Sequence, residues 1–378
     1  MKALRIGNLV IPTPIIQGGM GVGISLSGLA AAVANEGGIG VISAAGLGML
    51  KPGGSKNFLE NNLLELQNEI RKARSLSSGT IGVNIMVALT NYPDLVKTAI
   101  DEGIDLIFSG AGLPLDLPKY LTPGSKTKLV PIVSSARAAN LICNKWMNNY
   151  GYLPDAIVVE GPKAGGHLGF KAEQLFDENY ALEKLIPEVL EVATQFEFKH
   201  NKSIPVIAAG GIYSGADIAD FLKLGASGVQ MGTRFVTTHE CDATDAFKQA
   251  YVNAKKDDVK IIKSPVGMPG RAINSSFLED VEAGKRHPKT CPVNCIHTCD
   301  IKTAPYCIMA SLTSAHRGNF NRGYAFAGSN VWRTDEIISV KELMNTLKTE
   351  YESYSIKAQL QSGSFYQNSN EIRERISA

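Results

Sequence analysis

The chain has no long apolar run and no excess of either charge. No uninterrupted apolar stretch approaches the roughly 20 residues that a membrane-spanning helix requires. The 378 residues include 38 Lys and Arg and 36 Asp and Glu, a net charge of +2, so neither nucleic acid nor a membrane surface is expected as a partner. Arg5 places a charge where a secretory signal needs its apolar core. We therefore expect a cytoplasmic protein.

Two common nucleotide-binding motifs are also missing. The chain has no Gly-x-x-x-x-Gly-Lys-Ser/Thr motif, and no Gly-x-Gly-x-x-Gly follows an apolar run. The glycines at positions 18, 19, 21 and 23 do not have that spacing. These absences argue against a P-loop protein and against a dedicated dinucleotide-binding fold.

Short apolar runs, too brief for helices, alternate with longer segments of helical periodicity. The runs are 14–17, 40–43, 81–85, 106–109, 129–133, 156–160, 206–208 and 228–231. The helical segments are 26–35, 58–74, 94–102, 136–148, 182–198, 216–224 and 242–255. Eight such strands within about 250 residues predict an α/β fold of the (β/α)8 type, the TIM barrel. A doubly wound open sheet is the alternative.

Small and polar residues follow the carboxyl end of all eight apolar runs. Examples are Asn84, Gly210-Gly211 and Gly232-Thr233. In a barrel these ends converge on one face, where active sites are built, whereas in an open sheet only those near the switch point meet. The pattern favours the barrel, which we assign to residues 1–256. Because no linker-like break follows, residues 257–378 are expected to pack on it as a C-terminal lid or helical extension, with an amphipathic helix near 340–351.

Two strand ends predict a phosphate site. Gly210-Gly211 ends the seventh run just before a helix, and Gln230-Met231-Gly232-Thr233 ends the eighth. Backbone N–H groups at these two ends form the usual phosphate site of a barrel, and paired glycines let the backbone approach the ligand closely. The spacing indicates phosphate without specifying the nucleotide.

His167 lies near the end of a glycine-rich loop, 161–169, that follows the sixth run. An isolated histidine is more often structural, but this position faces the barrel mouth, where a general base or hydrogen-bond donor belongs. We therefore predict that His167 is the catalytic residue.

Six motifs in order carry a resemblance to a known family. They are Gln17-Gly18-Gly19-Met20, Gly82-Val83-Asn84-Ile85-Met86, Ser109-Gly110-Ala111-Gly112, Ala164-Gly165-Gly166-His167, Ala208-Ala209-Gly210-Gly211-Ile212 and Gln230-Met231-Gly232-Thr233-Arg234-Phe235. Together they resemble the nitronate monooxygenase (2-nitropropane dioxygenase) family, which also includes flavin-dependent enoyl-ACP reductases.

The resemblance implies an FMN held over the barrel mouth. Gly19 and Met20 would meet the isoalloxazine, Asn84 would bond its polar edge, and Glu160 and Gly165 would line the ribityl side. His167 matches the family's active-site histidine, which in the monooxygenases takes the α-proton of a neutral nitroalkane. The full set implied for the cofactor is Gly18, Gly19, Met20, Asn84, Glu160, Gly165, Gly166, Gly210, Gly211, Gln230, Met231, Gly232 and Thr233.

Two activities follow from the resemblance. The first is oxidation of alkyl nitronates with O2, and the alternative is NAD(P)H-dependent reduction of an enoyl thioester or related acceptor. A third hypothesis is a flavin-binding barrel that senses redox state or docks a partner; the intact His167 weighs against a purely non-catalytic role. A homodimer is compatible with the sequence, which specifies neither the physiological substrate nor the electron donor.

A departure from the family and the surface charge both bear on the substrate. Glu160 stands where several relatives carry Gln, and a carboxylate there would be costly beside an anionic ligand unless a cation such as Lys163 paired with it. A reductase acting on an acyl carrier protein should have a basic entrance for that acidic partner. The candidates for such an entrance are Arg271, Lys285, Arg286 and Lys289.

Four of the six cysteines cluster late in the chain, as Cys291-x3-Cys295-x3-Cys299-x7-Cys307. Disulfides are disfavoured in a cytosolic chain, so the alternatives are a metal or iron–sulfur site and inert thiols. The spacing matches neither the Cys-x2-Cys pairs of zinc sites nor the bacterial ferredoxin pattern. Both alternatives stay open at this point, and no metal ligand is assigned.

Overall fold

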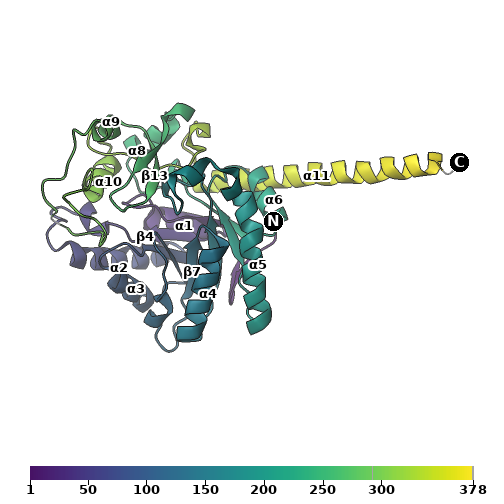
Figure 1. Cartoon of the computed structure of the whole chain (residues 1–378), viewed down its shortest axis with the longest axis horizontal. Helices are drawn as coiled ribbons and strands as arrows, with labels where there is room; N and C mark the ends of the chain where they lie inside the picture. Colours follow the sequence, from purple (N-terminus) through teal and green to yellow (C-terminus); the bar gives the residue numbers. More distant parts are fainter. Residues whose placement is uncertain (292, 377–378) are drawn as a thin grey trace.

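The computed structural model describes residues 1–291 and 293–376, and its centre is an eight-stranded parallel sheet (Figure 1). The strand order is β3-β11-β10-β8-β7-β6-β5-β4. The eight strands are β3 (Ile15–Gln17), β4 (Gly40–Ser43), β5 (Ile81–Met86), β6 (Leu106–Gly110), β7 (Lys128–Val133), β8 (Ile157–Glu160), β10 (Val206–Ala209) and β11 (Gly228–Met231). Each lies within one residue or two of a predicted run, and the predicted barrel is confirmed.

The two outermost strands of this order, β3 and β4, meet and close the sheet. The backbone N–H of Gln17 donates to the carbonyl of Ile39 at 2.9 Å, and the N–H of Ile39 donates to the carbonyl of Ile15 at 3.0 Å. Ile39 directly precedes β4, so these bonds continue the parallel ladder around the cylinder. A closed sheet leaves no unpaired strand edge.

Branched and aromatic side chains fill the barrel interior. Phe108 of β6 is fully buried there, and a Cβ atom on Gly82 of the neighbouring β5 would lie 2.8 Å from its ring. The antiparallel hairpin of β1 (Leu4–Ile6) and β2 (Leu9–Ile11) contributes further buried side chains to the same cluster. The barrel is therefore a packed core, and a ligand is expected at its mouth.

Helices surround the barrel, but the ring they form is irregular. The regular members are α1 (Ser27–Asn35), α2 (Phe58–Leu76), α3 (Tyr92–Asp101), α4 (Ala136–Tyr150), α5 (Leu182–His200) and α6 (Gly215–Lys223). After β6 there is only a short 3-10 helix, Leu117–Tyr120. After β11 the chain forms the four-residue α7 (Thr233–Val236) and then α8 (Asp245–Val252).

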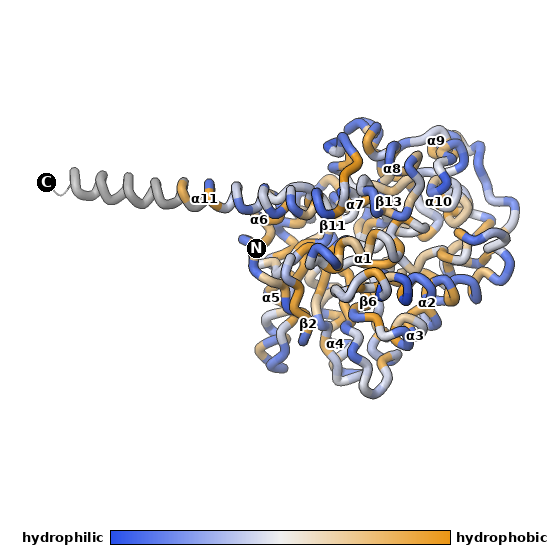
Figure 2. Tube along the Cα trace, turned by 180° about the vertical axis from the view of Figure 1, so that it is seen from behind, coloured by the Kyte–Doolittle hydropathy of each residue, from blue (hydrophilic) through white to orange (hydrophobic). Residues whose placement is uncertain are grey.

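The last helix, α11 (Val340–Ile376), packs against α6 and α1 (Figures 1 and 2). Leu343, Met344 and Leu347 on its first turns are fully buried. Gly215 permits the close approach, because a Cβ atom there would lie 2.3 Å from the carbonyl oxygen of Leu347. The helix exceeds the predicted range 340–351 by 25 residues, to Ile376.

The rest of the extension covers the carboxyl ends of the barrel strands. It contains β12 (Val259–Lys263), β13 (Pro269–Ile273), α9 (Ser276–Glu282) and α10 (Ile308–His316). β13 pairs with β12 and also with the two-residue β9 (Gly166–His167), which follows β8, so the three strands form one antiparallel sheet. Residues 292, 377 and 378 of the predicted extension lie outside the described residues. Among the described helices, none is both long and apolar enough to cross a bilayer.

Candidate active site

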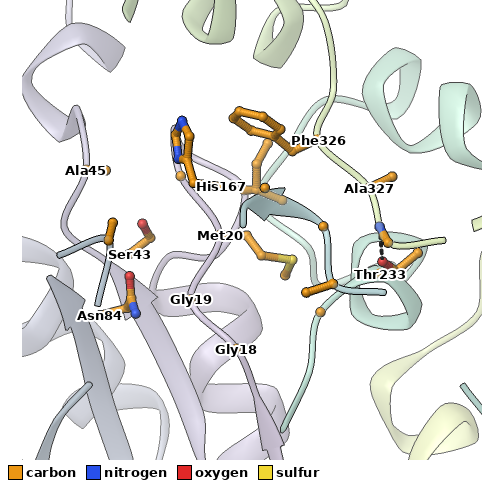
Figure 3. A pocket seen from close by; sticks show the side chains of 18 of the residues that line it. Gly18, Gly19, Met20, Ser43, Ala45, Asn84, His167, Thr233, Phe326 and Ala327 are labelled. Atoms are coloured by element: carbon orange, nitrogen blue, oxygen red, sulfur yellow. Dashed lines mark hydrogen bonds between the residues drawn. The ribbon is translucent and has the colours of Figure 1, made fainter. Parts of the chain in front are cut away.

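A cavity of about 270 Å³ lies at the carboxyl ends of the barrel strands, beneath the extension (Figure 3). All fourteen residues predicted for the site line it, although they come from five separate parts of the chain. They are Gly18, Gly19, Met20, Asn84, Glu160, Gly165, Gly166, His167, Gly210, Gly211, Gln230, Met231, Gly232 and Thr233. The fold therefore brings the predicted residues together, while the role of each stays a prediction.

Several polar side chains that line the cavity have no hydrogen-bond partner among the described residues. Examples are Asn84 near the end of β5, Glu160 at the end of β8 and Gln230 near the end of β11. The side chains of these three residues form no hydrogen bond with another described residue. Buried polar groups are normally hydrogen-bonded, so unpartnered groups that line a cavity fit a polar ligand. A cofactor with a hydrogen-bonding edge would satisfy them.

Gly19 makes room for one of these side chains. A Cβ atom on Gly19 would lie 2.3 Å from the Cβ of Asn84 and 3.3 Å from a methyl of Val41. No real Cβ approaches another carbon so closely, so any larger residue at position 19 would displace Asn84 from the position shown in Figure 3. The glycine of the Gln17-Gly18-Gly19-Met20 motif thus has a packing reason beyond close approach to a ligand.

The opposite end of the cavity suits an anion. Gly210 and Gly211 adopt left-handed conformations, with φ of 97° and 86°, which L side chains rarely adopt. The backbone N–H groups of Gly211 and Gly232 donate to no other described residue. The hydroxyl of Thr233 accepts a hydrogen bond from the N–H of Gly328 at 3.0 Å, drawn as the dashed line in Figure 3. Free backbone donors at two strand ends match the predicted phosphate site.

His167 stands on β9, which pairs with β13 through Gly270. Its Nε2 lies 2.8 Å from the hydroxyl oxygen of Ser264, and its ring packs edge-on against Phe326 with 4.9 Å between centroids. Burial lowers the pKa of His167 to about 4, so the imidazole is neutral at physiological pH. A neutral imidazole held by a hydroxyl on one nitrogen is in the protonation state required of a proton acceptor.

The prediction that Glu160 needs a cationic partner is not met. Within the described residues Glu160 and Lys163 form no ion pair. Burial instead raises the pKa of Glu160 to about 8, which keeps the group protonated at neutral pH. A neutral carboxylic acid carries one O–H donor and one carbonyl acceptor, so it can replace the Gln of relatives without adding charge.

The extension supplies cavity residues that the sequence analysis did not assign. Most are apolar and form one wall: Val266, Ile296, Ile308, Met309, Leu312, Tyr324, Phe326 and Ala327. They lie on the short helix α10 and on irregular segments, and the hydrophobic periodicity of the sequence did not identify either as part of a site. Two residues of the segment that follows Ala327, Gly328 and Asn330, also line the cavity.

One of the four candidates for a basic entrance does not lie at the surface. Arg271 is buried, and its guanidinium donates to the carbonyls of Pro162 and Ala164, where it holds the loop before His167. Lys285 and Arg286 both pair with Asp280, at 3.4 and 2.7 Å. Lys289 stays exposed. None of these four side chains is among the residues that line the cavity.

Comparison with known proteins agrees with this geometry. The family model described as nitronate monooxygenase matches residues 2–350. The chain belongs to the nitronate monooxygenase family. It is 30% identical to a probable nitronate monooxygenase of Staphylococcus aureus, over 72% of this chain and 78% of the relative.

A further relative and two solved structures are also similar to this chain. A (3aS,4S,5R,7aS)-5-hydroxy-7a-methyl-1-oxo-octahydro-1H-indene-4-carboxyl-CoA dehydrogenase of Mycobacterium tuberculosis is 30% identical, over 73% of this chain and 67% of its own. The structure of FabK from Thermotoga maritima superposes with a TM-score of 0.70 at 28% identity, covering 92% of this chain and 96% of FabK. A nitroalkane oxidase structure from Streptomyces ansochromogenes, 22% identical with a TM-score of 0.69, shares the fold. Family membership makes the chain an oxidoreductase.

Proposed function

We propose that the protein is an FMN-dependent nitronate monooxygenase that oxidises alkyl nitronates with O2. The observation that carries this proposal is the neutral His167, which faces a cavity whose polar side chains and backbone donors have no protein partner. Bound FMN would supply the redox chemistry that no side chain can perform. The carboxyl and amide heads and the free N–H groups of the cavity fit its polar ring edge and its phosphate.

The protein's own contribution is positioning and proton transfer. Gly18, Gly19 and Met20 would bound the ring, and Gly211 and Gly232 would donate their N–H groups to the phosphate. For His167 to act as a base, its Nε2–H must donate to the oxygen of Ser264, which leaves Nδ1 free to accept the α-proton of a neutral nitroalkane. Ser264 Oγ also accepts a weak hydrogen bond from the N–H of Val266 at 3.3 Å, which fixes the hydroxyl in place.

The test is anaerobic mixing of the purified flavoprotein with propionate-3-nitronate, NADH and NADPH in turn, while flavin absorbance is followed. Bleaching by the nitronate alone supports the monooxygenase. Rapid bleaching by a nicotinamide, with the nitronate inert, overturns it.

The second candidate is an NAD(P)H-dependent reductase of an acyl thioester, and the apolar wall of the cavity favours it. Ile296, Ile308, Met309 and Leu312 offer more apolar surface than a short nitronate can cover. The Mycobacterium tuberculosis relative is named for a carboxyl-CoA substrate. If a nicotinamide bleaches the flavin, enoyl-CoA esters of increasing chain length are the next substrates, and reoxidation that accelerates with length would support this function.

A further inference from the structure

Strand β13 places Phe326 beside His167. One edge of β13 is occupied by β12 along its whole length. On the other edge His167 pairs with Gly270, and Phe326 pairs with Ala272, two residues farther along. Side chains directly opposite one another in an antiparallel pair lie on one face, and so do residues i and i+2 of a strand. The imidazole and the phenyl ring therefore project from the same face of one sheet.

The segment that carries Phe326 is fixed by its backbone. The N–H of Ala327 donates to the carbonyl of Arg271 at 3.1 Å, and the hydroxyl of Tyr251 donates to the carbonyl of Phe326 itself. Gly165, which directly precedes β9, lets the two segments meet, because a Cβ atom there would lie 2.5 Å from the carbonyl carbon of Ala327. The sheet and its neighbours therefore determine where the phenyl ring lies.

Gly270 provides the room for the contact between the two rings. A Cβ atom on Gly270 would lie 2.9 Å from Cε1 of Phe326, so the phenyl ring occupies the space that a side chain at position 270 would take. From there it meets the imidazole of His167 edge-on, with 4.9 Å between centroids and 62° between planes (Figure 3). Tyr324 packs against the same phenyl ring with 5.0 Å between centroids, which limits its movement.

Burial, rather than a neighbouring charge, lowers the pKa of His167. The titratable side chains on the elements packed around it are Glu160, Tyr251, Lys260, Lys263, Arg271 and Tyr324. Both lysines are exposed, Arg271 donates to two backbone carbonyls of the loop before His167, and burial keeps Glu160 protonated. Apolar packing therefore keeps water from the imidazole, and Phe326 supplies the ring contact.

We propose that Phe326 is a positioning residue for His167. Its ring fixes the orientation of the imidazole, so that the nitrogen not bonded to Ser264 is presented to the substrate, and it shields the imidazole from water. Gly270 belongs to the same arrangement, because only a residue without a side chain lets the phenyl ring reach this place. The chemistry of this inference rests on the proposed function, in which His167 accepts a proton, but the contact can be tested without turnover.

The test is nuclear magnetic resonance of the histidine nitrogens in the full-length flavoprotein, with the His167 signals assigned by their absence from His167→Ala. In the unmodified protein the imidazole should stay neutral, as one tautomer, down to about pH 5, in line with its pKa of about 4. In Phe326→Ala the midpoint of the titration should rise by about one pH unit or more, and the signals should average between the two tautomers. An unchanged midpoint and tautomer in this variant would overturn the proposal.

Phe277→Ala is the matched control. Phe277 is buried in α9, and its ring packs against Tyr306 and Tyr324 rather than against His167. The substitution removes the same ring from the same aromatic cluster, so it should leave the His167 titration unchanged whatever it does to the melting temperature. An equal shift in Phe277→Ala and Phe326→Ala would mean that any gap in the cluster has this effect, and the specific role of Phe326 would be lost.

Gly270→Ala tests the same contact without removing the ring. The added methyl should push the phenyl ring away from the imidazole and raise the titration midpoint of His167. In a protein that already carries Phe326→Ala, the change at Gly270 should have little further effect, because the ring that it displaces is gone. Fully additive shifts would show that Gly270 acts by another route and would contradict the ring contact as the cause.

Turnover separates this inference from the proposed function. In Phe326→Ala, kcat for a neutral nitroalkane should fall by about tenfold or more, because the base is misplaced. Resonance shifts as expected in a protein that consumes neither nitroalkane nor nitronate would keep the positioning role and reject the proposed function. Nitroalkane turnover by the unmodified protein, with an unshifted His167 titration in Phe326→Ala, would reject the positioning role alone.

Discussion

The side-chain amide of Asn330 donates to the carbonyl of Gly211 at 2.6 Å, which joins the extension to the end of β10. The backbone continues the contact, because the N–H of Ser329 donates to the carbonyl of Lys163 at 3.1 Å. The predicted phosphate end of the cavity is therefore assembled from the barrel and from a segment more than a hundred residues later. Changes at Gly211 should affect both the ligand and this junction.

Replacing Gly211 with Leu should weaken FMN binding by about tenfold or more, a loss of ~1.4 kcal/mol or greater. Position 211 has a φ of 86°, and a Cβ atom there would lie 2.7 Å from the Cβ of Lys163. The measurement is the dissociation constant of FMN, from flavin fluorescence.

Gly124→Leu is the matched control for that change. Gly124 has a φ of 85°, but a Cβ atom there meets nothing within 4 Å. It should carry the same backbone strain and keep its flavin. Equal flavin loss in both variants, or none in Gly211→Leu, would place the phosphate elsewhere.

Removing the imidazole with His167→Ala should keep the flavin but slow turnover of a neutral nitroalkane far more than turnover of the preformed nitronate. A missing general base typically costs about 100-fold to 10,000-fold, and the nitronate has already lost the proton in question. The comparison is kcat/KM for the two substrate forms. An equal loss for both would exclude proton abstraction by His167.

The pH profile offers an independent check on the same residue. Because burial lowers the pKa of His167 to about 4 from 6.5, the neutral base persists well into the acid range. We expect kcat/KM for the neutral nitroalkane to stay level down to about pH 5 and to fall near pH 4. An acid limb centred near 6.5 would mean that the imidazole titrates as if exposed to solvent.

Glu160→Gln should keep the flavin and remove one source of pH-dependent stability. The folded pKa of Glu160 is about 8 against 4.5 for the free group, so the folded state holds an extra proton between these values and loses stability as pH rises through that window. The melting temperature of the unmodified protein should therefore fall between about pH 5 and 8 more steeply than that of the variant. Identical slopes would show that Glu160 is ionised throughout.

Leu347→Ala should destabilise the whole barrel, although the residue lies in the extension. Leu347 is fully buried where α11 packs on α6, and such truncations cost about 2–5 kcal/mol of unfolding free energy. Leu64→Ala on the exposed side of α2, where the side chain is 52% exposed, should change it by about 0.5 kcal/mol or less. Urea unfolding of both variants gives the comparison, and similar midpoints would mean that α11 contributes little.

The strands and the cavity residues at their ends were predictable because each is marked by a few consecutive residues of the sequence. An apolar run such as 206–208 followed by Gly210 marks both a buried strand and its functional end, and a barrel brings all such ends together. His167 was predictable for the same reason, since its position after β8 places it at the mouth. Its assignment to β9 was not, because a two-residue strand is defined only by its partner β13.

The features of the site that the sequence did not reveal depend on contacts between residues distant in sequence. Arg271 looks like a surface charge until two backbone carbonyls from the β8–β9 loop are seen to hold its guanidinium. The protonation state of Glu160 depends in the same way on burial, which no neighbouring residue in the sequence reveals. The apolar wall of the cavity comes partly from α10. The position of this helix depends on its packing against the barrel, which the hydrophobic periodicity of its own sequence does not reveal.

The position of α11 has a consequence for biosynthesis. Helix α11, which packs on both α6 and α1, begins at Val340, so the ribosome makes almost the whole chain before these contacts can form. Between the end of α7 at Val236 and Val340, translation at about 5–20 residues per second takes on the order of 5–20 s. During that interval the nascent barrel exposes an apolar stripe. Chains that end before Val340 lack the buried Leu343, Met344 and Leu347 and should therefore aggregate more readily than the full chain.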